Sequence, residues 1–141
     1  MHVNPYLSFD GTTEEAFNFY AKVLGGRIVT IMRFGDVPGC EGLSEKDKNR
    51  VMHAAFEADK VVLLATDATP DHPYEGIRGM SVALQVDTPE DAERIFAGLS
   101  EGAKHIEMPI AQTFWSVRFG MLTDAYNIRW MVNCVQAPPQ A

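Results

Sequence analysis

The feature that most constrains the fold is an internal repeat. Residues 6–29, YLSFDGTTEEAFNFYAKVLGGRIV, and residues 82–107, VALQVDTPEDAERIFAGLSEGAKHIE, follow the same plan. Each predicts a short strand that ends at an aspartate, an amphipathic helix that stops at a glycine, and a new strand. Two further strands follow each unit, over 51–58 and 60–67 in the first and over 114–122 and 127–135 in the second.

The two predicted helices have matching start signals and matching apolar faces. Thr12 or Thr13 can cap the first helix, and Asp87 or Thr88 the second, where Pro89 suits the first turn. The apolar stripes have the i, i+3, i+4, i+7 spacing of a helix that packs on one face. They comprise Ala16, Phe19, Tyr20, Val23 and Leu24 in the first helix, and Ala92, Ile95, Phe96 and Leu99 in the second.

The repeat predicts an α+β fold made of two βαβββ modules whose sheets join side by side. We expect a single domain over residues 1–141, with module one at about 1–67, a linker at about 68–79, module two at about 80–135, and a short C-terminal tail. The linker is rich in proline and glycine. The long polar loop over 35–50 has the length of a lid, a binding loop or a mobile segment.

Charge and composition narrow the function classes. The 141-residue chain carries a formal net charge of −7, which disfavours nucleic acid and anionic membrane surfaces as partners. No apolar run is long enough to span a membrane, and the N-terminus lacks the pattern of a signal peptide. The two cysteines, Cys40 and Cys134, fit no metal or redox motif and are expected to be reduced. We therefore expect a cytoplasmic protein.

Several motifs together resemble the vicinal oxygen chelate superfamily, which includes glyoxalase I, extradiol dioxygenases and bleomycin-resistance proteins, and more narrowly its PhnB-like branch. The motifs are PYLSFDG with EAFNFYAKVLGG, then MHAAF and LLATDATP, and finally TFWSVRFGMLTDAYNIRWMVN. The resemblance implies a glyoxalase-like fold over nearly the whole chain. Asn127 stands where the family turn has glycine, and asparagine is among the few residues that tolerate the positive φ of such a turn.

The resemblance also implies where a metal would be held. Superfamily metalloenzymes usually take one His or Glu ligand from each of four strands, the first, fourth, fifth and eighth. These positions fall on residues that are not ligands of that kind: Pro5, Leu64, Ser81 and Met131. A catalytic metal needs about three protein ligands. We therefore expect no metal at this site and no cofactor.

The candidate ligand cavity rests on one histidine and several aromatic residues. His53 is the only histidine inside a predicted core strand. It is a hydrogen-bonded structural residue, a polar group that contacts a ligand or transfers a proton, or a lone metal ligand. The remaining cavity candidates have plain core packing as their alternative. They are Trp115, Phe119, Trp130, Ser81 and Met131.

Charged residues near the strands have weaker claims. Arg118 and Arg129 can bind a carboxylate or phosphonate, or else form ion pairs at the surface. Glu57 and Asp67 lie at strand ends, where such residues usually face water. The surface is also where we expect His2, His72 and His105.

Three functions follow from these observations. The first is a binding protein that holds an unknown small molecule, aromatic or amphipathic, in a metal-free cup. The second is a metal-dependent lyase, isomerase or dioxygenase, which the superfamily suggests and the missing ligands oppose. The third is a metal-free enzyme that uses His53 as acid or base. The open sheet edges and the resemblance both predict a homodimer.

Overall fold

The computed structural model describes residues 1–135, so the predicted C-terminal tail lies outside the described residues. The chain divides into two compact units, Met1–Gly76 and a second that begins at Ile77. Among the described residues, no helix is both long enough and apolar enough to cross a membrane.

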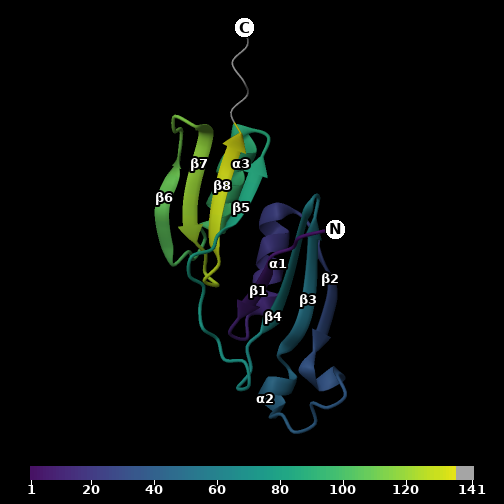
Figure 1. Cartoon of the computed structure of the whole chain (residues 1–141). Helices are drawn as coiled ribbons and strands as arrows, with labels where there is room; N and C mark the ends of the chain where they lie inside the picture. Colours follow the sequence, from purple (N-terminus) through teal and green to yellow (C-terminus); the bar gives the residue numbers. More distant parts are fainter. Residues whose placement is uncertain (136–141) are drawn as a thin grey trace. The chain divides into compact units, whose positions relative to one another are not determined.

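The first unit is a βαβββ module (Figure 1). Its four strands form a mixed sheet in the order β1-β4-β3-β2, in which β1 and β4 are parallel and the other neighbours antiparallel. Between β2 and β3 the chain forms a 3-10 turn, η1 (Phe34–Asp36), and a short helix, α2 (Glu45–Lys48), so part of the predicted polar loop is folded. The main elements are β1 (Tyr6–Phe9), α1 (Thr13–Leu24), β2 (Arg27–Arg33), β3 (Val51–Ala58) and β4 (Val61–Asp67).

The second unit repeats this plan, as the sequence predicted. Its sheet has the equivalent order β5-β8-β7-β6, again with one parallel pair, β5 and β8. Asn127 has φ 73° in the turn before the last strand, which confirms that this asparagine adopts the positive φ expected of the family's glycine. The elements are β5 (Val82–Val86), α3 (Pro89–Leu99), β6 (His105–Ala111), β7 (Ser116–Thr123) and β8 (Arg129–Val135).

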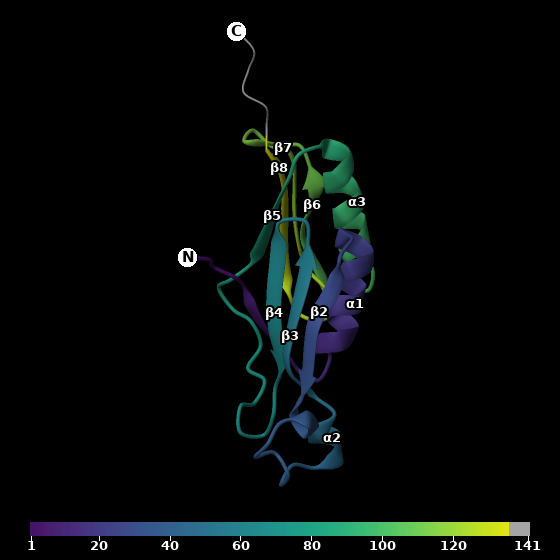
Figure 2. The same ribbon diagram turned by 90° about the vertical axis from the view of Figure 1, so that its right-hand side faces the viewer.

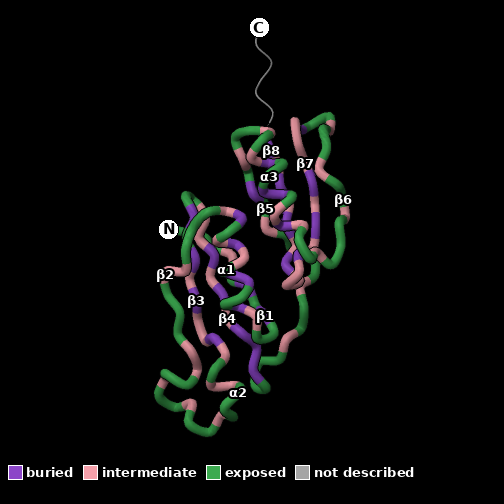
Figure 3. Tube along the Cα trace, turned by 180° about the vertical axis from the view of Figure 1, so that it is seen from behind, coloured by how far each residue is buried: buried purple, intermediate pink, exposed green. Residues whose placement is uncertain are grey.

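The helices α1 and α3 each cover one face of the sheet in their own unit and leave its other face without a helix (Figure 2). Successive strand residues point to opposite faces, so the strands alternate between buried residues under the helix and more exposed ones on the open face. Figure 3 shows this alternation along the central strands. The core of each unit therefore lies between helix and sheet, and the open face is the surface available for function.

The helix stripes are partly as predicted. All four stripe residues of α3 are buried. In α1, however, Phe17 is fully buried, whereas Phe19 and Leu24 are half-buried. The predicted stripe of α1 was therefore wrong in omitting Phe17. This residue packs against Phe9 and Phe56 of the sheet, with ring centroids 6.2 and 5.7 Å away.

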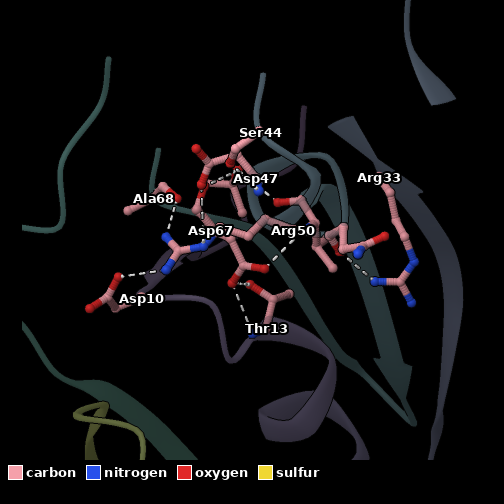
Figure 4. A network of polar contacts seen from close by, with 11 residues as sticks. Asp10, Thr13, Arg33, Ser44, Asp47, Arg50, Asp67 and Ala68 are labelled. Carbon is pink, nitrogen blue, oxygen red and sulfur yellow. Dashed lines mark hydrogen bonds and ion pairs between the residues drawn. The ribbon is translucent and has the colours of Figure 1, made fainter. Parts of the chain in front are cut away.

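A buried carboxylate ties the first unit together (Figure 4). Asp67, 4% exposed, accepts hydrogen bonds from the backbone N–H and hydroxyl of Thr13 and from the backbone N–H of Val51. It joins the start of α1, the start of β3 and the end of β4. The expectation that a carboxylate at this strand end faces water was wrong, because three donors compensate its burial.

Arg50 extends this network towards the surface (Figure 4). Its guanidinium donates to the Ala68 carbonyl and pairs with Asp10 at 3.2 Å. Gly11, with φ +85°, lies directly under that group, where a Cβ would be 3.1 Å from an Arg50 nitrogen. The loop after β1 is therefore held by contacts that leave little room for a side chain.

Candidate functional site

The open face of the first sheet carries a tyrosine–histidine pair. The Tyr6 hydroxyl lies 3.1 Å from Nδ1 of His53, and the two ring centroids are 5.9 Å apart. Tyr6 is 54% exposed and His53 half-exposed. Partial burial raises the pKa of Tyr6 above its ordinary value, which favours the neutral hydroxyl. His53 is thus hydrogen-bonded and also lies on the open face, and its contact with a ligand stays a prediction.

The surroundings of this pair are polar on one side and apolar on the other. Ser8 and Thr66 are register partners on β1 and β4, and Met32 is the register partner of His53 on β2. The bond to Tyr6 occupies Nδ1 of His53, so Nε2 is the ring nitrogen that remains for a ligand. This face can offer a hydroxyl and an imidazole, the groups that proton transfer requires.

The open face of the second sheet is built from aromatic, methionine and amide side chains. Phe119, Met131 and Asn133 are half-buried there, because the residues that alternate with them, such as Val132 and Leu122, are buried under α3. The Trp115 ring meets the Phe119 ring at 5.5 Å and is itself 48% exposed. Phe119 and Met131 therefore lie on the open face and Trp115 contacts Phe119 there, while their role as cavity walls stays a prediction.

Two other cavity candidates have different surroundings. Trp130 is 1% exposed and donates its indole N–H to Asp124 Oδ2 at 2.8 Å, inside the core of the second unit. This is the core-packing alternative. Ser81 is exposed and immediately precedes β5.

The charged candidates Arg118 and Glu57 have a structural role and a surface position, and Arg129 is half-buried at the start of β8. Arg118 lies on the helix-covered side, where its Nε pairs with Glu93 of α3 at 2.9 Å. Glu57 is exposed near the end of β3. The three remaining histidines are exposed, as predicted: His2, His72 and His105.

The residues present do not fit the superfamily's four-ligand metal site. Pro5 precedes β1 and its carbonyl accepts from the backbone N–H of Leu64 on β4, whereas Ser81 precedes β5 and Met131 lies on β8. None of these four positions supplies a His or Glu. Within residues 1–135, no group of three or more His, Cys, Asp or Glu side chains is placed to hold a metal.

Sequence analysis did not single out three polar residues of the second unit, two on its open sheet face and one in its core. Gln85 and Asn133 form an amide pair on the second open face, with Asn133 Nδ2 donating to Gln85 Oε1 at 2.7 Å. Asp124 is fully buried and organises the turn before β8. The alternation of side chains along β5 and β8 could have placed both amides on the same open face of the sheet, because successive strand residues point to opposite faces.

Two βαβββ units with no His or Glu at the metal-ligand positions define a glyoxalase-like protein without the usual ligand set. The model for the Glyoxalase/Bleomycin resistance protein/Dioxygenase superfamily matches residues 2–132, and the chain belongs to that superfamily. It is 42% identical to protein PA1353 of Pseudomonas aeruginosa, whose crystal structure superposes with a TM-score of 0.87 over 97% of this chain and 99% of that one.

Two further relatives place the chain among the PhnB-like members. The PhnB protein of Bacillus cereus is 26% identical, with a TM-score of 0.78 over 96% of this chain and 100% of that one. Protein YjdN of Escherichia coli strain K12 is 29% identical over 147 residues, which cover 99% of each chain. The α+β fold and the family that the sequence predicted are therefore confirmed.

Proposed function

We propose that this protein binds a small aromatic or amphipathic molecule against its open sheet faces, and that it does so without the superfamily metal. One observation carries the proposal: the superfamily's metal-ligand positions hold Pro5, Leu64, Ser81 and Met131, none of them a His or Glu, while each sheet keeps a face that no helix covers. Such a surface, apolar with a few polar groups, is typical of a small-molecule site.

A ligand screen tests this function. Thermal shift against a library of aromatic compounds should find ligands, and elemental analysis of the purified protein should find no stoichiometric divalent metal. Phe119→Ala should weaken binding because it removes an aromatic wall. Phe34→Ala is the matched control, since Phe34 is also a half-buried phenylalanine but belongs to η1, outside the strands. Failure of every compound to bind, or one tightly held metal per chain, would contradict the proposal.

The tyrosine–histidine pair supports a second candidate, a metal-free acid–base enzyme. The Tyr6 hydroxyl fixes the orientation of the His53 ring and leaves Nε2 for a substrate. Any ligand from the screen should then be checked for turnover by mass spectrometry. His53→Gln should abolish turnover, and Tyr6→Phe should reduce it while His53 is retained. Turnover that survives His53→Gln would exclude this role.

We also propose a homodimer, as the resemblance implies. The edge strands β2 and β6 expose apolar side chains, including Met32 at 40% and Met108 at 36%. Covering them by a second copy would remove this apolar surface from water. Light scattering with size-exclusion chromatography measures the mass directly, and a monomer at micromolar concentration would contradict the proposal.

A further inference from the structure

Three side chains form one row across the open face of the second sheet. Gln85 of β5 is the register partner of Asn133 of β8, and Asn133 is the register partner of Phe119 of β7. Neighbouring strands are about 4.8 Å apart, so the row spans about 10 Å from the phenyl ring to the outer amide. That length matches a molecule of one or two fused rings.

The two amides in this row leave hydrogen-bonding capacity unused. Asn133 Nδ2 donates to Gln85 Oε1 at 2.7 Å, while Asn133 Oδ1 lies buried with no hydrogen-bond partner. A buried amide oxygen that no donor reaches is destabilising, so a ligand that supplies the donor gains from filling this position. Gln85 is exposed, so its side chain can move aside to admit a molecule that supplies the donor.

The unused groups are the same whichever way the two amides are turned. Each amide has one oxygen acceptor and one NH₂ donor, and the bond between them uses one of each. If both amides rotate, Gln85 donates and Asn133 accepts, and the pair again retains one oxygen and one NH₂ group. The pair therefore always presents an acceptor together with a donor.

The aromatic end of the row supplies a stacking surface. The Phe119 ring lies next to Asn133 in the register, and the Trp115 ring contacts it at 5.5 Å and 68°. Offset or edge contacts with such rings favour flat, unsaturated ligands. A ligand that satisfies the whole row is thus flat at one end and carries an N–H beside a C=O at the other.

We propose that the row Gln85–Asn133–Phe119 is a recognition site for a planar ring with a lactam edge, an N–H adjacent to a carbonyl. The lactam N–H donates to the free amide oxygen, and the lactam carbonyl accepts from the free NH₂ group. The ring packs against Phe119 and Trp115. This inference rests on the proposed ligand-binding function and names the chemical class of the ligand.

Three matched probes separate the lactam from the ring. 2-Quinolone has the N–H and the carbonyl, N-methyl-2-quinolone has the donor blocked, and quinoline has neither the N–H nor the carbonyl. Titration calorimetry should give a dissociation constant for 2-quinolone about tenfold below that of the N-methyl compound, because only the first supplies the missing donor. Side-chain NH₂ signals of Gln85 and Asn133 in ¹⁵N-labelled protein should shift with 2-quinolone.

Variants show which residues make the discrimination. Asn133→Leu should remove the preference for 2-quinolone over its N-methyl derivative, because it removes the oxygen that accepts the lactam N–H. Gln85→Leu should weaken the binding of both quinolones, because it removes the NH₂ group that donates to their carbonyl. Quinoline affinity should stay within about twofold in both variants, a change below 0.5 kcal/mol. Gln112→Leu replaces an exposed glutamine outside the row and should change nothing. Because Gln85 is exposed, its variant tests the inference even if Asn133→Leu fails to fold.

The outcomes are distinguishable. Equal binding of the three probes by the native protein would overturn the lactam inference and leave the ligand-binding function intact. A preference that survives in a folded Asn133→Leu variant, or an unchanged affinity of Gln85→Leu for both quinolones, would also overturn it. If no probe binds and the aromatic library yields no ligand, the proposed function fails, and the lactam inference fails with it.

Discussion

Replacing Asp124 tests how the most distinctive stretch of the chain is held together. Asp124 is fully buried, and its Oδ1 accepts from the backbone N–H groups of Tyr126 and Ile128 at 2.8 and 2.9 Å. Its Oδ2 accepts from the Trp130 indole at 2.8 Å. One side chain thus shapes the turn before β8 and anchors the largest buried side chain of the second unit.

The size of the effect follows from these contacts. Asp124→Asn keeps an oxygen for the two backbone donors but turns an NH₂ group towards the Trp130 N–H, so donor faces donor. Losing one buried hydrogen bond to a charged group costs about 1.5–3 kcal/mol. Asp124→Ala leaves all three donors without their acceptor, and we expect it to cost more, about 3–5 kcal/mol.

A double-mutant cycle with Trp130→Phe isolates the indole bond. Urea unfolding followed by circular dichroism gives the free energy of unfolding for each variant. In the Trp130→Phe background the Asp124→Asn change should cost about 1–3 kcal/mol less, because the lost N–H no longer opposes the NH₂ group. Additivity of the two changes within about 0.5 kcal/mol would refute the view that this bond holds the turn to the core.

Three other predictions concern packing and charge. Gly120→Ala should destabilise by about 1–3 kcal/mol, since its Cβ would lie 2.6 Å from the Phe96 ring, while Gly42→Ala, with no atom within 4 Å, is a neutral control in the same thermal melts. Asp67→Asn should lower the free energy of unfolding in urea by about 2–3 kcal/mol, because one of its three accepted bonds then faces an NH₂ group; an unchanged midpoint would contradict this. Partial burial raises the pKa of Tyr6 above 10.0, so its contribution to stability is complete below that pH and is lost as the pH rises through the higher folded-state value. The ultraviolet titration of the native protein minus that of Tyr6→Phe should show this midpoint, and a value at or below 10.0 would contradict it.

The fold was predictable because its signals are local and occur twice. Alternation, helix stripes and turn residues each act over a few neighbours, and two copies of the same order leave few topologies. The cap at Thr88 formed as expected, with its hydroxyl accepting from Asp91 N–H. Thr13 did not follow this rule, because its hydroxyl donates to the distant Asp67 instead.

The polar details were less predictable because they depend on contacts between distant residues. Thr13 and Asp67 are 54 positions apart, and Asn133 and Gln85 are 48 apart. Strand alternation says which face a residue occupies, but only the register says which residue lies beside it. For the same reason the sequence singled out His53 without its partner Tyr6.

The internal repeat shows where the two modules have diverged. The pair Gln85 and Asn133 on the second sheet corresponds to the pair Ser8 and Thr66 on the first, since each joins the first and last strands of its module, one residue before the end of the first strand. In the second module the register of β7 and β8 continues this row to Phe119. Most helix-facing positions are apolar in both copies, with Asp67 and Arg118 as polar exceptions that are each hydrogen-bonded. The open rows differ more, since the first offers a pair of hydroxyls and the second a pair of amides, so the two faces present different groups to a ligand.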